Sequence, residues 1–137
     1  MKIIVKRNIF SLIVALAIAY LSLTDPAKFN HLSISRFHNI DKAVHFAMYF
    51  TLMSAIGYEN KAYLHSRIRL LVIALIPFFY GAVMEILQSL FTTYRTGSIF
   101  DFLFDLAGIM ASVGLFIIFR AKSGHKAGRT GITADPE

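Results

Sequence analysis

Residues 70–91 read LLVIALIPFFYGAVMEILQSLF, an apolar run in which Glu85 is the one charged residue. About 20 mostly apolar residues are enough for an α-helix to cross the hydrocarbon core of a bilayer. Runs of this length are typical of transmembrane helices rather than of soluble cores. This segment therefore predicts a transmembrane helix and an integral membrane protein.

Three further apolar blocks lie on either side of this segment, at Ile9–Leu23, Ala43–Gly57 and Ile99–Phe119. The second block is short and contains His45, so it needs Asp41, Lys42 and Tyr58 at its flanks to reach spanning length. Hydrophobic residues make up 56% of the chain and charged residues only 16%, which suits a lipid-facing surface. We therefore expect an all-α membrane protein, a bundle of four transmembrane helices.

The Lys and Arg residues outside the blocks predict how the helices are oriented. They are denser before the first block, between the second and third, and after the fourth than in the two remaining loops. By the positive-inside rule, the N-terminus, the Lys61–Arg69 loop and the C-terminal tail lie in the cytoplasm. The loops at 25–40 and 92–98 are then expected to face outward.

This interpretation gives one membrane domain, residues 1–119, followed by a basic, disordered cytoplasmic tail at residues 120–137. The N-terminus also matches a signal peptide with a small-residue site at Ala17–Ala19. Because the apolar run continues to Leu23 and cleavage would leave an odd number of spans, we expect this helix to be retained. The net charge of +6 does not indicate nucleic-acid binding, since the basic residues flank the blocks, and the chain contains no cysteine for disulfides.

Polar side chains gather at one predicted level of the membrane. Glu85 and Gln88 are three residues apart, so both project from one side of their helix near its outer end. A charge near the bilayer centre costs about 2.5–3.5 kcal/mol, so Glu85 should face protein partners or water. The other polar residues predicted at this level are Asp41, Lys42, His45, Tyr49, Arg95, Ser98, Asp101 and Asp105. We therefore predict a polar pocket bounded by three helices and open toward the outer face.

Simpler structural roles explain part of this pattern. Ser98 and Asp101 have the spacing of a capping box, and Asp41 suits the first turn of its helix. Lys42 can extend its ammonium group to the interface, and Arg95 can neutralise a nearby carboxylate.

Small residues predict where helices pack closely. Gly108 and Ser112 have the small-x-x-x-small spacing that lets two helices approach, and Gly81 can do the same on a helix opposite them. Pro77 should kink the third helix.

The ordered string Asp41-Lys42-x-x-His45-x-x-x-Tyr49, Glu85-x-x-Gln88, Arg95-x-x-Ser98-x-x-Asp101 and Gly108 resembles the VanZ-like family of small bacterial membrane proteins. Family members commonly have Asn where this chain has Asp105, and often Gly where it has Ser112. The resemblance implies a multi-pass protein of the bacterial cytoplasmic (inner) membrane and cell envelope. Because the family is named for a member associated with teicoplanin resistance, a link to glycopeptide susceptibility is one expectation. The resemblance implies no defined biochemical activity.

The leading hypothesis is a non-transporting membrane protein whose pocket binds the polar or anionic headgroup of an envelope lipid. Lys42 and Arg95 would contact the anion, while Glu85 and Gln88 would orient the headgroup.

Two other function classes remain open. One is an intramembrane hydrolase or transferase acting on a lipid-linked envelope precursor, with His45 or Glu85 as general base, although no nucleophile or cofactor motif supports it. The other is a proton-coupled carrier, for which the inner halves of the blocks lack the necessary acids. His45, Glu85 and Asp105 could ligate a metal, but one histidine with scattered carboxylates is a weak pattern, so the sequence assigns no metal and no cofactor.

Overall fold

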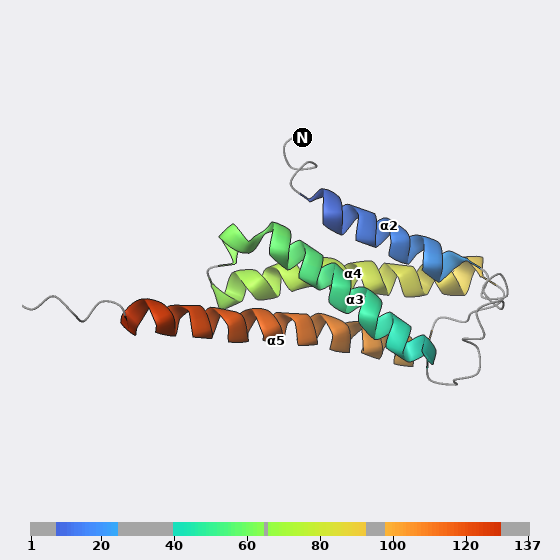
Figure 1. Cartoon of the computed structure of the whole chain (residues 1–137). Coiled ribbons are helices and arrows are strands. Elements are labelled where there is room, and N and C mark those ends of the chain that lie inside the picture. Colours follow the sequence, from blue (N-terminus) through green and yellow to red (C-terminus); the bar gives the residue numbers. More distant parts are fainter. Residues whose placement is uncertain (1–7, 25–39, 65, 93–97, 130–137) are drawn as a thin grey trace, which may run out of the picture.

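The computed structural model describes residues 8–24, 40–64, 66–92 and 98–129. They form four α-helices, α2 (Ile9–Leu23), α3 (Ile40–Glu59), α4 (Arg67–Phe91) and α5 (Ile99–Arg129), and a 3-10 helix, η3 (Lys61–Tyr63). The prediction of an all-α chain with four helices is confirmed for these residues. Consecutive helices run in opposite directions, so α3 and α5 begin where α2 and α4 finish (Figure 1). We name this the acidic end, because Asp41 and Asp101 lie there in the first turns of α3 and α5.

The helices differ in how well they suit a membrane. By length and apolarity, α4 and the Ile99–Arg120 part of α5 are candidate spans, while α2 is apolar but shorter. α3 is less apolar because its first turns carry Asp41, Lys42 and His45. Large apolar side chains such as Leu16 and Ile76 are more than half exposed. An exposed apolar surface of this extent is expected of a protein that contacts lipid.

The helix bounds follow the apolar blocks at most ends. α4 starts about one turn before its block because the side chain of Ser66 accepts a hydrogen bond from the backbone N–H of Arg69 at 3.2 Å, which caps the helix. α5 differs from the prediction, because it continues past Phe119 to Arg129. The first part of the predicted tail, residues 120–129, is therefore helical, with no proline to interrupt it, while the domain division and the disorder expected of the tail stay predictions. Residues 130–137 lie outside the described part of the chain.

α3 is the central helix of the bundle and contacts the other three, most extensively α5. Its buried side chains Tyr49, Leu52, Met53 and Ile56 form the middle of the hydrophobic core. The other helices contribute Ile18, Leu70, Ala74, Ile109 and Val113 to the same core. The polar residues at the start of α3 therefore lie on the helix that packs most extensively against the rest of the bundle.

Small residues bring α3 and α5 together. A Cβ atom added to Gly108 would meet the backbone of α3, 2.9 Å from the nitrogen of Phe50 and closer still to the carbonyl oxygen of Phe46. One turn along, the hydroxyl oxygens of Ser112 and Ser54 are 2.9 Å apart. The Gly108–Ser112 face therefore packs on α3.

The start of α2 is fastened to the end of α3. The carboxylate of Glu59 accepts the backbone N–H groups of Phe10 at 2.7 Å and Ser11 at 3.1 Å, which would otherwise be unsatisfied in the first turn of α2. Partial burial by itself would raise the pKa of the Glu59 carboxyl. The hydrogen bonds that it accepts from Ser11 and Phe10 outweigh this effect and lower its pKa. Glu59 lies just past the predicted span. This cross-helix cap lies at the bundle end opposite the acidic one.

Candidate functional site

A buried histidine–carboxylate pair joins α3 to α5 near the acidic end. Nδ1 of His45 lies 2.9 Å from Oδ1 of Asp105, a hydrogen-bonding distance. Both side chains are 2% exposed, although they are separated by 60 residues in the sequence. Burying two such groups is favourable only when they satisfy each other, so this pair holds the two helices in a defined register.

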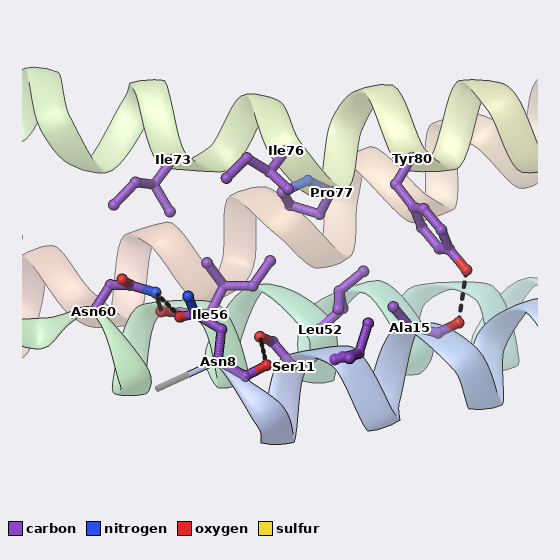
Figure 2. A pocket seen from close by; sticks show the side chains of 11 residues that line it. Asn8, Ser11, Ala15, Leu52, Ile56, Asn60, Ile73, Ile76, Pro77 and Tyr80 are labelled. Atoms are coloured by element: carbon purple, nitrogen blue, oxygen red, sulfur yellow. Dashed lines mark hydrogen bonds between the residues drawn. The ribbon is translucent and has the colours of Figure 1, made fainter. Parts of the chain in front are cut away.

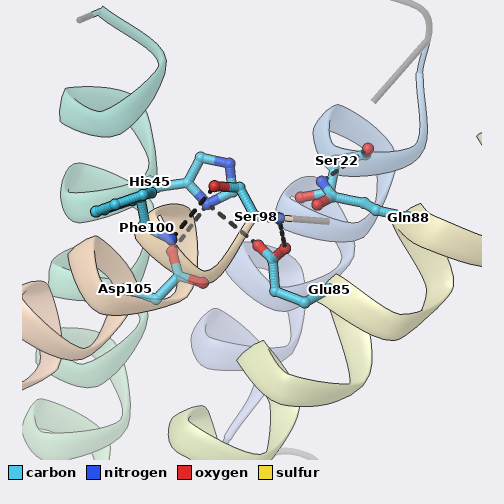
Figure 3. A network of polar contacts seen from close by, with 7 residues as sticks. All are labelled: Ser22, His45, Glu85, Gln88, Ser98, Phe100 and Asp105. Carbon is cyan, nitrogen blue, oxygen red and sulfur yellow. Dashed lines mark hydrogen bonds and ion pairs between the residues drawn. The ribbon is translucent and has the colours of Figure 1, made fainter. Parts of the chain in front are cut away.

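α4 adds a third ionisable group to the pair. Oε1 of Glu85 lies 4.0 Å from Nδ1 of His45, and the side chain is 13% exposed. Its second oxygen, Oε2, accepts the backbone N–H of Ser98 at 3.0 Å, so Glu85 caps the start of α5 from the neighbouring helix (Figure 3). Of the capping box predicted for Ser98 and Asp101, the Ser98 hydroxyl does cap α5, because it accepts the backbone N–H of Phe100 at 3.2 Å, whereas the Ser98 N–H is bound by Glu85 rather than by Asp101. Glu85 faces protein rather than lipid, as its charge requires.

Two more carboxylates lie beside His45 at the acidic end. A ring nitrogen of His45 and carboxylate oxygens of Asp41 and Asp101 all lie within 4.8 Å of one another. The same limit holds for His45, Glu85 and Asp105. We name the five residues, His45, Asp41, Asp101, Glu85 and Asp105, the His45 cluster. It contains four carboxylates around one imidazole, so it attracts groups that are cationic or that donate hydrogen bonds.

Two buried polar atoms near the cluster are unpaired. Among the described residues, neither Nε2 of His45 nor the hydroxyl of Tyr49 has a hydrogen-bond partner. Tyr49 packs over Gly81 of α4, where an added Cβ would lie 3.1 Å from the Tyr49 ring and 3.5 Å from Oδ2 of Asp105. Gly81 therefore makes room beside the cluster, a role that its sequence position did not reveal.

Three predicted pocket residues lie elsewhere or outside the described structure. The amide of Gln88 is buried and donates to the backbone oxygen of Ser22 at 3.0 Å, so Gln88 binds α4 to the end of α2 (Figure 3). The ammonium of Lys42 lies 5.8 Å from the centroid of the Phe100 ring, on an adjoining surface. Arg95 is outside the described residues. No sequence signal could identify the Ser22 contact, because its acceptor is a backbone carbonyl.

A cleft of about 340 Å³ between α4 and α5 reaches the cluster at Glu85. Glu85 and Ser98 form part of its wall, while Ile86 and Ile99 at its mouth are largely exposed. The remaining lining residues are Ala82, Ser89 and Phe102. The cleft thus combines a polar wall with an apolar rim that suits contact with lipid.

A second cavity, of about 410 Å³, lies between α2, α3 and α4 (Figure 2). Its lining is mostly apolar and includes Leu52, Ile73 and Pro77. The hydroxyl of Tyr80 on its wall donates to the backbone oxygen of Ala15 at 2.6 Å. The Tyr80 hydroxyl of this cavity thus joins two helices, whereas the α4–α5 cleft is lined by Glu85 of the His45 cluster.

The comparison with protein families matches the VanZ/LLP1 domain to residues 3–120. The chain belongs to the VanZ/LLP1 family. The resemblance seen in the ordered motifs is thereby confirmed, and this VanZ-like domain includes α2, which precedes those motifs. Together with the apolar helices, the match identifies a VanZ-like membrane protein. No curated protein and no solved structure matches the chain.

Proposed function

We propose that this VanZ-like protein crosses the membrane with all four helices and binds the polar headgroup of an envelope lipid at its acidic end. In this arrangement both termini lie in the cytoplasm and the acidic end faces outward, in a bacterial cytoplasmic membrane. α3, with 20 residues, is about 30 Å long, enough to cross the hydrocarbon core with Asp41 and Glu59 at the two membrane surfaces. α2, with 15 residues, is about 22 Å long, a mismatch that local bilayer thinning can accommodate.

The observation that carries the binding proposal is the cleft between α4 and α5. A lipid can place its acyl chains against Ile86 and Ile99 while its headgroup reaches Glu85 and Ser98. Because the His45 cluster is rich in carboxylates, it favours a headgroup with an ammonium or hydroxyl donor, such as phosphatidylethanolamine. An anionic headgroup would instead rely on Lys42 and Arg95.

The test is lipid binding to the purified full-length chain in detergent. Short-chain phosphatidylethanolamine should bind more tightly than phosphatidylglycerol, and Glu85→Gln should weaken that binding at least tenfold, equivalent to about 1.4 kcal/mol. Glu59→Gln removes the same charge at the opposite end and should bind normally. Equal affinity in folded Glu85→Gln would refute the headgroup site. A preference for phosphatidylglycerol that is lost in Lys42→Ala with Arg95→Ala would instead favour the anionic headgroup.

A second candidate function is an intramembrane hydrolase or transferase acting on a lipid-linked envelope precursor. The His45–Asp105 pair favours it, because a carboxylate that orients an imidazole is a common arrangement for a general base. Incubation with lipid-linked precursors, with and without divalent cations, should then give product that His45→Gln does not make. Absence of turnover under both conditions would leave binding as the function.

A further inference from the structure

The hydrogen bond at Nδ1 determines which nitrogen of His45 can bind a ligand. With Asp105 ionised, its carboxylate can only accept, so the ring proton in the 2.9 Å contact lies on Nδ1. The neutral ring then presents a lone pair on Nε2, which points away from Asp105 and Glu85 (Figure 3). Metal-binding histidines commonly have this arrangement, with one nitrogen on the ion and the other donating to a carboxylate.

The free lone pair is buried within the cluster. His45 is 2% exposed, and within the described part of the chain Nε2 has no hydrogen-bond partner. A buried acceptor without a partner is uncommon and calls for a bound ligand. Since carboxylates surround this ring, the ligand that satisfies both the lone pair and the negative charge is a cation.

We propose that the acidic end binds a divalent transition-metal cation through Nε2 of His45 and the carboxylates of Asp41 and Asp101. These three residues offer ligand atoms within 4.8 Å of one another. Ligands about 2.0–2.2 Å from a zinc ion lie roughly 3–3.5 Å apart, so small side-chain rotations would complete the site. Asp105 is then a positioning residue, which holds the ring in the metal-binding tautomer.

The mixture of donors selects the class of cation. One imidazole with two carboxylates suits Zn²⁺ or Mn²⁺, whereas Mg²⁺ and Ca²⁺ prefer oxygen ligands throughout. This inference goes beyond headgroup binding and does not depend on it, because metal binding can be measured without lipid. A bound cation would also offset the charge of the carboxylates.

The experiment uses the full-length chain in detergent after treatment with a chelator. Zn²⁺ is titrated into this sample, and binding is measured by calorimetry. Four other histidines in the chain could bind Zn²⁺ weakly, so His45→Asn defines the background. We expect one saturable site above that background, weakened at least tenfold in Asp101→Asn and in Asp41→Asn. Glu59→Gln, which removes a carboxylate at the opposite end, should bind Zn²⁺ as the unmodified chain does.

Two further measurements separate metal binding from folding. Asp101→Asn keeps the His45–Asp105 pair, so its helicity should be normal even though its Zn²⁺ binding is weakened. Asp105→Asn should bind Zn²⁺ about 10–100-fold more weakly, and the ¹⁵N NMR shifts of His45 should show the proton no longer confined to Nδ1. Equal Zn²⁺ affinity in the unmodified chain and folded Asp101→Asn would overturn the proposal, as would no saturable site above the His45→Asn background.

Discussion

A methyl group at position 108 tests the closest approach between two helices of the bundle. In Gly108→Ala the new Cβ would lie 2.9 Å from the nitrogen of Phe50, whereas comfortable contacts begin at about 3.5 Å. Because the obstacle is backbone, α3 and α5 must separate by roughly half an ångström or more. Overpacking of this kind costs about 1–3 kcal/mol.

Gly114→Ala is the matched control, since an added Cβ there meets nothing within 4 Å. Both variants gain the same helix propensity, about 1 kcal/mol, so their difference isolates the steric effect. Gly108→Ala should therefore be less stable than Gly114→Ala by about 1–3 kcal/mol in unfolding followed by circular dichroism in detergent.

The same separation should reach the functional site. Gly108 lies one turn after Asp105, so moving α5 away from α3 stretches the 2.9 Å contact with His45. Zn²⁺ binding should weaken in Gly108→Ala and remain unchanged in Gly114→Ala. If the two variants proved equally stable, backbone contact between α3 and α5 would be refuted.

Three other predictions address the ends of the bundle. Because the pKa of Glu59 is lowered in the fold, its carboxylate stabilises the fold at neutral pH, and this contribution is lost as the pH falls from about 4.3, the ordinary pKa of Glu, through the lowered value. Glu59→Gln should therefore remove about 1 kcal/mol at pH 7 and flatten the pH profile of unfolding. An unchanged profile would contradict the cap. Gln88→Leu should lose about 1–3 kcal/mol of stability, because it leaves the carbonyl of Ser22 without its donor. Once folded, this variant should bind lipid normally. Loss of lipid binding would indicate that Gln88 belongs to the pocket. Because the chain lacks cysteine, Lys61→Cys and Thr93→Cys can each be labelled as the single thiol of the protein in intact cells. A membrane-impermeant thiol reagent should modify position 93 and leave position 61 unmodified. The reverse pattern would show that the topology is opposite to the one predicted.

The sequence by itself determined the four α-helices of the described residues and half of the residues at which they begin or end. Ile9–Leu23 was predicted with the bounds that the structure has, because an apolar run is a local property of composition. The polar residues His45, Glu85 and Asp105 were also identified from sequence, since each is costly within an apolar block. α5 extends beyond its block because an apolar run marks the part of a helix that suits the hydrocarbon core, not the residue at which the helix ends.

Only the tertiary structure decided which helix each polar or small side chain meets. Glu85 and Gln88 leave the same side of α4, yet Glu85 reaches His45 and Ser98 while Gln88 reaches Ser22. Spacing along one helix defines a shared face, but the partner depends on the order of neighbouring helices and their rotation about their axes. The hydrogen bond between His45 and Asp105 arises from that packing, because the two residues are 60 positions apart in the sequence. The same packing therefore decides which nitrogen of His45 can bind a ligand.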